Sequence, residues 1–302
     1  MNGFFNINKP AGMSSAAVVG VMKRLTGEKR VGHAGTLDPE AAGVLPIMVG
    51  RATRLFDYLV DKRKEYETVC AFGFATDTQD ATGEVTERGE NYPSIDRVRE
   101  ETEKLTGDII QKPSMYSAIK VGGKPLYVRA RKGETVDVPE RTVRIDGIDV
   151  IGEEAEHGVR MRVRCGKGTY IRSVCDDLGK LCGCPAHMRS LTRIRSGYFV
   201  ISEAMDLDTA RELAAAGTLG DQLIPMDAPL GAMMRTQVPE ELRKAVAAGA
   251  KLAAARLSGD IPEEDGVSRI YLGDEFWGIA MREGENMVWR AQMPPEEYEK
   301  YE

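Results

Sequence analysis

Residues 159–165 set the strongest constraint on the fold, because apolar side chains there alternate strictly with Arg160, Arg162 and Arg164. Successive side chains of a β-strand point to opposite faces, so the pattern predicts a strand with one apolar and one basic face. Two interpretations follow: an edge strand whose arginines face water, or a basic strand beside a phosphate backbone. Both require a sheet with a core on one side.

The surrounding sequence predicts helices packed on that sheet. Residues 51–60 suit a helix and residues 66–72 a strand. Ser94 is a suitable N-cap for a helix over 95–105 that Gly107 ends. A further amphipathic helix begins at the end of segment 166–172, with an apolar face made by Ile171, Val174, Cys175 and Leu178. The fold class predicted is α+β.

A second, smaller domain is predicted after a cluster of prolines between Pro225 and Pro239. It contains a short helical stretch at 240–250 and probable strands at 267–272, 276–281 and 287–290, joined by glycine-containing turns. The chain of 302 residues is long enough for both parts to hold a core. We therefore expect one domain at 1–230 and a β-rich domain at 235–302.

Composition excludes several classes of protein. The hydrophobic fraction of 42% and charged fraction of 29% are ordinary for a globular protein. No apolar run reaches the roughly 18 residues of a membrane span, and the amino terminus lacks a signal-peptide core. Five cysteines without such a signal favour free thiols in the cytoplasm. Cys175, Cys182, Cys184 and His187 do not have zinc-site spacing, so no metal is expected.

The net charge of -6 hides a basic middle section. Residues 112–195 carry 17 Lys and Arg against 10 Asp and Glu, whereas residues 200–302 carry 10 against 20. A polyanion responds to the local field of a surface, so the middle section is suited to phosphate contacts, although a solvated basic face is an equal alternative. Residues 112–132 add Tyr116 and Tyr127 among several lysines, which fits either an RNA-contacting loop or a surface hairpin.

The densest motif is GHAGTLDPEAAGVLP at 32–46. Its glycines permit a close approach of the backbone to a ligand. Because Pro39 disfavours helical geometry at the preceding residue, Asp38 presents its carboxylate from a stiff loop. The alternative is an ordinary Asp-Pro turn in which Asp38 caps the next element.

A second motif, GKGTYIR at 166–172, opens the amphipathic helix. Glycine-rich approaches to helix N-termini attract anions, but the pattern is not that of a nucleotide-binding P-loop. Arg172 lies in the first helical turn, where its charge opposes the helix dipole, so it requires a carboxylate partner. Such a cation beside Asp38 would keep that carboxylate ionised and oriented. Since no nucleophile elbow and no dinucleotide fingerprint occur, a carboxylate acting alone is the best catalytic candidate.

Six ordered blocks together resemble the TruB family of bacterial tRNA pseudouridine-55 synthases. They are NKPAGMSS at 8–15, the 32–46 motif, KEY at 64–66, TDTQDATG at 76–83, PSMYSA at 113–118 and GTYIR at 168–172. The last part of the chain resembles, more loosely, the small PUA-type RNA-binding domain. The resemblance implies a pseudouridine synthase fold with a central mixed, mainly antiparallel sheet flanked by helices and loops, a thumb-like RNA-contacting insertion at 112–135 and a PUA-like domain at 235–302.

The resemblance also implies a reaction and roles for residues. One uridine in the T-loop of tRNA is detached, rotated and rejoined through carbon, with no metal or organic cofactor. Asp38 matches the catalytic aspartate, Tyr66 the tyrosine that stacks on the base, and Arg172 the arginine paired with the aspartate. Further substrate-binding residues are expected in or beside the matching blocks: His33, which helps to expel the nucleotide, Leu191, a wall residue, and Lys9, Lys64, Met115 and Tyr170. A monomer acting without a protein partner is expected.

Several alternatives stay open. Asp38 attacks the base or the sugar, or abstracts the C2′ proton on the way to a glycal. A guide-RNA-dependent synthase of box H/ACA particles shares these motifs, although the acidic carboxy terminus favours a stand-alone enzyme. A third function is that of a tRNA-folding chaperone or RNA-binding module that retains the catalytic fold. The isomerisation itself requires that the uridine be extruded, since a stacked uridine does not reach a carboxylate.

Overall fold

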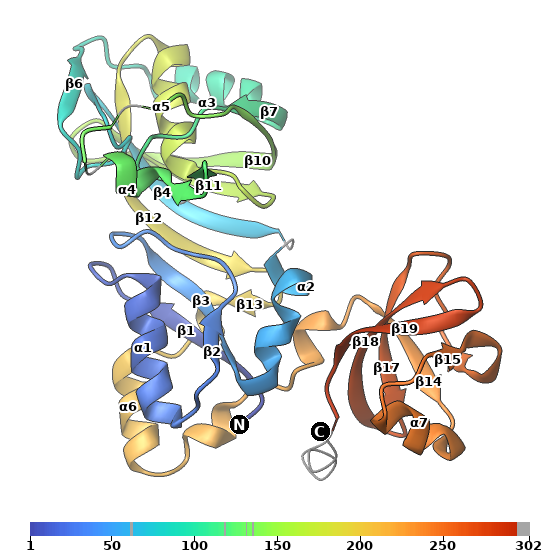
Figure 1. The fold of residues 1–302 in the computed structure, drawn as a ribbon. Coiled ribbons are helices and arrows are strands. Elements are labelled where there is room, and N and C mark those ends of the chain that lie inside the picture. The colour runs from blue at the N-terminus through green and yellow to red at the C-terminus, as the bar shows by residue number, and fades with distance from the viewer. Residues whose placement is uncertain (61–62, 118, 131, 135, 295–302) are drawn as a thin grey trace.

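The computed structural model describes residues 1–60, 63–117, 119–130, 132–134 and 136–294. Its first part is built on a nine-stranded sheet with strand order β1-β3-β12-β4-β11-β10-β7, to which β2 and β13 add at β3 and β12 (Figure 1). The strands of this sheet are β1 Gly3–Lys9, β2 Val31–His33, β3 Ala42–Val49, β4 Lys64–Phe72, β7 Gly107–Gln111, β10 Arg141–Glu154, β11 Gly158–Cys165, β12 Ala186–Ser196 and β13 Phe199–Val200. All named pairs are antiparallel except β12 with β3, so the predicted mixed, mainly antiparallel sheet is confirmed.

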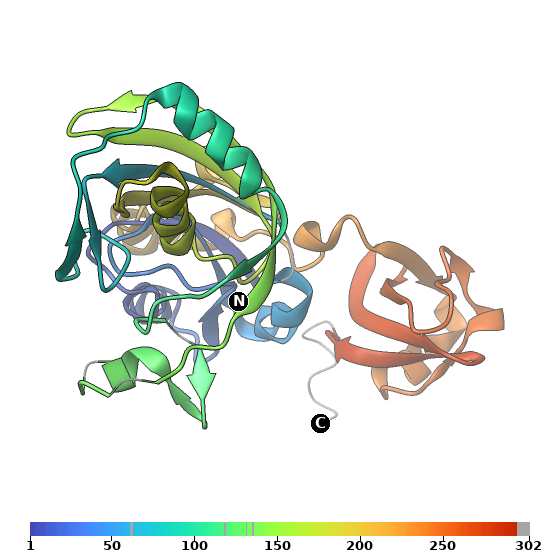
Figure 2. The ribbon, with the colours of Figure 1, turned by 90° about the horizontal axis from the view of Figure 1, so that it is seen from above.

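Helices cover the sheet at both of its ends. The α-helices are α1 Ser15–Thr26, α2 Phe56–Val60, α3 Ile95–Lys104, α4 Leu126–Ala130, α5 Ile171–Cys182, α6 Leu207–Ala215 and α7 Arg243–Ala247. Helices α3 and α5 pack together on the half of the sheet formed by β12, β4, β11 and β10, and α5 lies in its concave face (Figure 2). Helices α1 and α6 pack on β1 and β3.

Alternation along the strands explains this layering. On β1, Phe5 and Ile7 face α1 and α6, whereas Phe4 faces a second cluster with Leu55 and Phe199. Because neighbouring side chains of a strand point to opposite faces, a strand with apolar residues at consecutive positions is covered on both sides. The 3-10 helix Gly50–Leu55 and α2 provide that second cover where a single helix over 51–60 was predicted.

The arginine-bearing strand is β11, and it lies inside the sheet between β4 and β10. The edge-strand interpretation is therefore wrong. Its three arginines pair with carboxylates of the neighbouring strands: Arg160 with Glu154, Arg162 with Glu67, and Arg164 with Asp149. The basic face is thus largely neutralised by cross-strand ion pairs, which weakens the case for a phosphate contact there.

Other local predictions agree with the structure. Ser94 caps α3, accepting a hydrogen bond from the Arg97 amide at 3.3 Å, and the helix ends before Gly107, whose φ of 94° opens β7. The helix after residue 170 is α5, and its predicted apolar face is buried. No helix in the described part of the chain is long and apolar enough to cross a membrane.

The last part of the chain forms a separate six-stranded sheet with the order β15-β19-β18-β17-β14-β16. Its strands are β14 Met234–Val238, β15 Leu252–Ala253, β16 Ser258–Gly259, β17 Val267–Leu272, β18 Glu275–Glu283 and β19 Asn286–Gln292. The three predicted strands correspond to β17, β18 and β19. Strand β14, which pairs parallel to β17, lies in the proline-flanked segment that was predicted to be a boundary.

This C-terminal sheet shares a hydrophobic cluster with the first part. Ile279, Ala291 and Met293 belong to the same buried cluster as Leu59 and Leu230. Polar contacts reinforce the junction, since the Tyr271 hydroxyl donates to Asp227 at 2.6 Å. The thumb-like segment projects from the opposite side and contains the hairpin β8 Lys120–Val121 and β9 Lys124–Pro125 with α4 (Figure 2); the short hairpin β5 Phe74–Thr76 and β6 Val85–Arg88 lies beside β12.

Candidate active site

Asp38 lies in the loop between β2 and β3, which we call the catalytic loop (residues 34–41). Two buried contacts fix this loop to the start of α1: the Ser15 hydroxyl accepts from the Leu37 amide and donates to its carbonyl, both at 2.9 Å. The Pro39 carbonyl accepts from the Gly12 amide at 2.9 Å. The loop predicted to be stiff from the Asp-Pro pair is thus also held by contacts with residues outside it. The Asp38 side chain keeps 40% of its surface exposed.

Arg172 pairs with Asp38, as the family resemblance implies. Its Nε lies 3.0 Å from Asp38 Oδ2, and its Nη1 lies 3.6 Å from Asp80 Oδ2. Two carbonyl oxygens accept from the same guanidinium, that of Thr78 at 3.1 Å and that of Tyr116 at 3.1 Å. With only 6% of its side chain exposed, Arg172 is fixed in one geometry and orients the Asp38 carboxylate.

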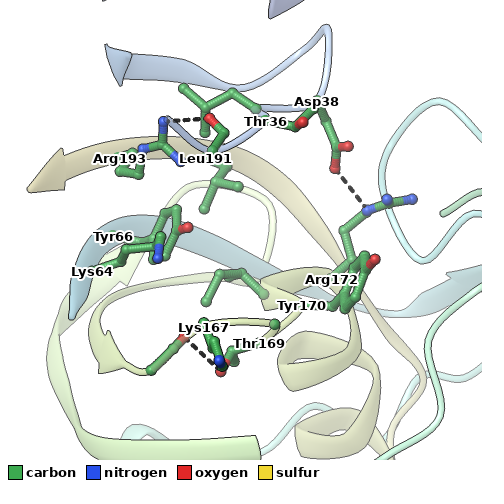
Figure 3. Close-up of a pocket in the computed structure, with 15 residues that line it drawn as sticks. Thr36, Asp38, Lys64, Tyr66, Lys167, Thr169, Tyr170, Arg172, Leu191 and Arg193 are labelled. Atoms are coloured by element: carbon green, nitrogen blue, oxygen red, sulfur yellow. Dashed lines mark hydrogen bonds and ion pairs between the residues drawn. The ribbon is translucent and has the colours of Figure 1, made fainter. Parts of the chain in front are cut away.

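Asp38 and Arg172 lie on the rim of a small cavity of about 220 Å³ (Figure 3). Its walls come from the catalytic loop, β4, β12 and the residues that lead into α5. Tyr66 from β4 and Leu191 from β12 supply apolar surface, and Tyr170 stands beside Arg172. The site therefore joins a carboxylate and an arginine to aromatic and aliphatic surface.

The two tyrosines stay protonated at neutral pH. Burial raises the pKa of Tyr66, and the nearby Arg193 guanidinium opposes that shift only in part. Burial likewise raises the pKa of Tyr170, whose backbone is held by Gln111 through bonds of 3.0 and 3.2 Å. Both rings are thus neutral surfaces against which a planar base can stack.

Cations dominate the charged groups of the cavity. Lys64, Lys167, Arg172 and Arg193 line it together with one carboxylate, that of Asp38. An excess of positive charge around a small cavity favours an anionic ligand such as a nucleotide. No group of His, Cys, Asp and Glu in the described part of the chain is arranged to hold a metal ion, and the five cysteines are unpaired.

The structure brings most of the predicted site residues together, but not all. Asp38, Tyr66, Arg172, Lys64, Tyr170 and Leu191 line the cavity. His33 is half-buried on β2 outside the lining; burial lowers its pKa, and its Nδ1 has no hydrogen-bond partner among the described residues. Met115 is half-buried in the segment leading to the thumb, also outside the lining.

Lys9, which was expected to bind substrate, also lies outside the cavity lining. Its side chain is fully buried, and its Nζ donates to the carbonyl oxygens of Pro10 at 2.8 Å, Met13 at 2.5 Å and Pro39 at 2.9 Å. An ammonium whose three protons are all used by backbone oxygens has none left for a ligand. Lys9 instead holds the catalytic loop against the turn before α1.

Sequence reasoning missed Arg193, and it did not give Asp80 a role. Asp80 stands in one of the matching blocks, and its contact with Arg172 joins residues 92 positions apart in the sequence. Leu191 was expected to line the wall of the site, and Arg193 follows it by two positions. In a strand this spacing places both side chains on one face. That spacing was the available signal.

The mixed sheet with its flanking helices has the pseudouridine synthase fold, which solved structures share. The Cbf5 chain of a Cbf5-Nop10-Gar1 complex matches with a TM-score of 0.75 and 25% identity, covering 98% of this chain and 86% of that one. Cbf5 in an archaeal box H/ACA Nop10-Cbf5 complex matches with a TM-score of 0.74 and 24% identity, covering 98% and 88%.

Sequence comparisons identify the family within that class. Residues 23–171 match the model of the TruB family pseudouridylate synthase N-terminal domain, and residues 172–231 match that of the tRNA pseudouridylate synthase B C-terminal domain. Proteins named tRNA pseudouridine synthase B are similar: that of Bacillus licheniformis is 40% identical, covering 88% of each chain, and that of Alkaliphilus oremlandii is 41% identical, covering 96% of each. The chain belongs to the TruB family of pseudouridylate synthases.

Proposed function

We propose that this enzyme converts uridine 55 in the T-loop of tRNA to pseudouridine, with Asp38 as the catalytic carboxylate. The observation that carries the proposal is the Asp38–Arg172 pair, at 3.0 Å, on the rim of a cavity with room beside Tyr66. A partly exposed carboxylate held by a buried arginine has a fixed direction, as either a nucleophile or a base requires.

The remaining groups suit a uridine that has left its stack. Extrusion costs a few kcal/mol, and stacking on Tyr66 with apolar contact to Leu191 offsets part of it. Lys64 and Tyr170 are proposed to contact the same nucleotide from the cavity wall. His33 and Met115, which lie outside the wall, are proposed to act on the surrounding RNA, together with the lysines of the thumb-like insertion at 112–135.

The six-stranded C-terminal sheet is proposed to be the PUA-like RNA-binding domain, with the domain boundary between residues 230 and 235. The acidic balance of residues 200–302 limits how much of it meets phosphate. A monomer in the cytoplasm, without a protein partner or cofactor, is proposed to suffice.

The decisive test is to incubate the purified chain with an unmodified tRNA transcript and no additives, and then to map pseudouridine. We expect modification at position 55 by the wild type and none by Asp38→Asn, with tRNA binding retained by the variant. Turnover by Asp38→Asn would refute the role of the carboxylate. Modification at another site would refute the substrate.

The similarity to Cbf5 chains found in box H/ACA complexes supports one alternative, dependence on a guide RNA. Relatives named tRNA pseudouridine synthase B at about 40% identity favour the stand-alone enzyme. A wild type that is inactive alone but modifies RNA when a guide is added would establish the alternative. A tRNA-folding role is separate: it predicts that Asp38→Asn still restores tRNA folding in a deletion strain.

A further inference from the structure

Arg193 is the most deeply buried cation of the cavity wall, with 1% of its surface exposed. It stands directly opposite Tyr66 in the β12–β4 pair, so both side chains lie on the face of the sheet that forms the cavity. Its Nε donates to the Val44 carbonyl at 2.7 Å and its Nη2 to the Gly35 carbonyl at 3.0 Å. These two bonds fix the plane of the guanidinium beside the Tyr66 ring (Figure 3).

The charge of Arg193 has no counter-ion in the described part of the protein. Arg172, across the cavity, pairs with both Asp38 and Asp80, whereas no carboxylate within 4.0 Å pairs with Arg193. Backbone carbonyls satisfy two of its N–H groups but carry no net charge. Removing a guanidinium from water without an anion is unfavourable, so its presence in the wall indicates that the anion arrives with the substrate.

The proposed reaction generates such an anion. When the N1–C1′ bond breaks, its electron pair stays on uracil and spreads over N1, O2 and O4. The sugar either bonds through C1′ to the Asp38 carboxylate or loses its C2′ proton to it. C5 then attacks C1′, and the C5–C1′ bond forms as the C1′–O bond to Asp38 breaks or, on the second route, as the Asp38 carboxyl returns its proton to C2′. The C5 proton then leaves and N1 takes up a proton, so the product is an isomer of uridine. On both of these routes, in which Asp38 acts at the sugar, the uracil ring carries one negative charge between the two bond changes.

We propose that Arg193 is a catalytic residue that stabilises this uracil anion, an inference that rests on the proposed function. Asp38 and Arg193 occupy different sides of the cavity (Figure 3), so the carboxylate acts at the sugar and the guanidinium at the base. A donor fixed in advance on two carbonyls needs no reorganisation as the charge develops, which is the condition for strong electrostatic stabilisation. A phosphate of the extruded nucleotide is another anion that the fixed guanidinium could bind.

The test compares Arg193→Gln with the wild type in single-turnover assays at saturating tRNA, on substrates carrying uridine or 5-fluorouridine at the target. For uridine we expect the rate to fall by about 100-fold, while tRNA affinity changes by less than about 3-fold. Fluorine stabilises the departing base itself, so the defect in glycosidic-bond cleavage should shrink to about 10-fold or less on 5-fluorouridine. A phosphate contact would instead weaken binding and give equal defects on both substrates, and that result would overturn the proposal.

Two further variants keep the test interpretable. Arg193→Lys retains the charge and so protects the fold, but it loses the planar fork, and its smaller defect should again shrink on 5-fluorouridine. Arg195→Gln removes an exposed arginine of the same strand that pairs with Glu65, and it should leave the single-turnover rate unchanged. If Arg193 had a purely structural role, Arg193→Gln would be less stable, and its rate defect would be equal on uridine and 5-fluorouridine. That result would contradict the proposal. A wild type without isomerase activity would overturn the proposed function itself, and the role of Arg193 with it.

Discussion

Asp80 Oδ2 lies 3.6 Å from Nη1 of Arg172, so the guanidinium that orients the catalytic loop is itself anchored by a second carboxylate. Asp80 is in turn held by its own turn: its Oδ1 accepts from the Thr78 hydroxyl at 2.8 Å and from the hydroxyl and amide of Thr82 at 2.6 and 3.0 Å. The TDTQDATG segment thus contacts the Asp38 carboxylate only through Arg172, and it does not line the cavity.

Replacing Asp80 with asparagine should therefore lower kcat while leaving tRNA binding intact. The amide keeps the shape but not the charge, so Arg172 loses one of two anchoring carboxylates, and we expect a fall of about 10-fold or more. Single-turnover kinetics and a binding titration separate the two effects. Asp96→Asn, at an exposed residue of α3 paired with Arg99, is the matched control and should behave as wild type. Loss of affinity in Asp80→Asn would contradict this prediction.

Lys9→Met should destabilise the protein and reduce its activity. The substitution leaves three carbonyl oxygens, those of Pro10, Met13 and Pro39, without their donor, which should cost about 3 kcal/mol of unfolding free energy. Activity should fall as well because the Pro39 carbonyl belongs to the catalytic loop. Denaturant unfolding measures the first effect, and Lys23→Met, at an exposed lysine of α1, is the control. Equal stability of the two variants would show that the buried ammonium is dispensable.

The same lysine predicts a pH dependence. Burial lowers the pKa of Lys9 from 10.5 to about 8 in the folded protein, against the opposing charges of Glu40 and Asp38. Between these values the unfolded chain holds a proton that the native state has released, so the contribution of Lys9 to stability rises with pH. The difference in unfolding free energy between wild type and Lys9→Met should increase above about pH 8, by at most ~1.4 kcal/mol per pH unit. A difference that stays flat from pH 7 to 10 would contradict this assignment.

Gly43→Ala should be severely destabilising. Gly43 has a φ of 104°, and a Cβ there would lie 2.3 Å from the carbonyl oxygen of Arg193, its partner in the parallel β3–β12 pair. Backbone does not move aside easily, so we expect a loss of more than about 3 kcal/mol in denaturant unfolding. Gly217→Ala has a comparable φ of 74° but open space around it, and should cost only about 1 kcal/mol. Equal losses would show that conformation alone, and not the close approach, matters.

Each half of the Asp38–Arg172 pair carries a local physical signal, whereas the pairing of the two residues is what the family resemblance implies. A proline stiffens the aspartate loop, and a cation in the first turn of a helix needs a carboxylate. Both signals are properties of a few neighbouring residues. The strand at 159–165 and the Ser94 cap are predicted for the same reason, since period and capping chemistry are local.

The burial of Arg193 and Lys9 is harder to predict from local sequence. Long cationic side chains are normally exposed, and only tertiary contacts decide that these two are buried on backbone carbonyls. The partners of the β11 arginines come from β4 and β10, which are distant in sequence. Strand β14 is missed because its pairing with β17 spans about thirty residues and outweighs the flanking prolines.

The buried cluster that joins Leu59 and Leu230 to Ile279 and Met293 has a consequence for truncated forms of the chain. A chain truncated before residue 234 would expose the apolar side chains that the second sheet covers. Such an exposed apolar patch would make the truncated protein prone to self-association.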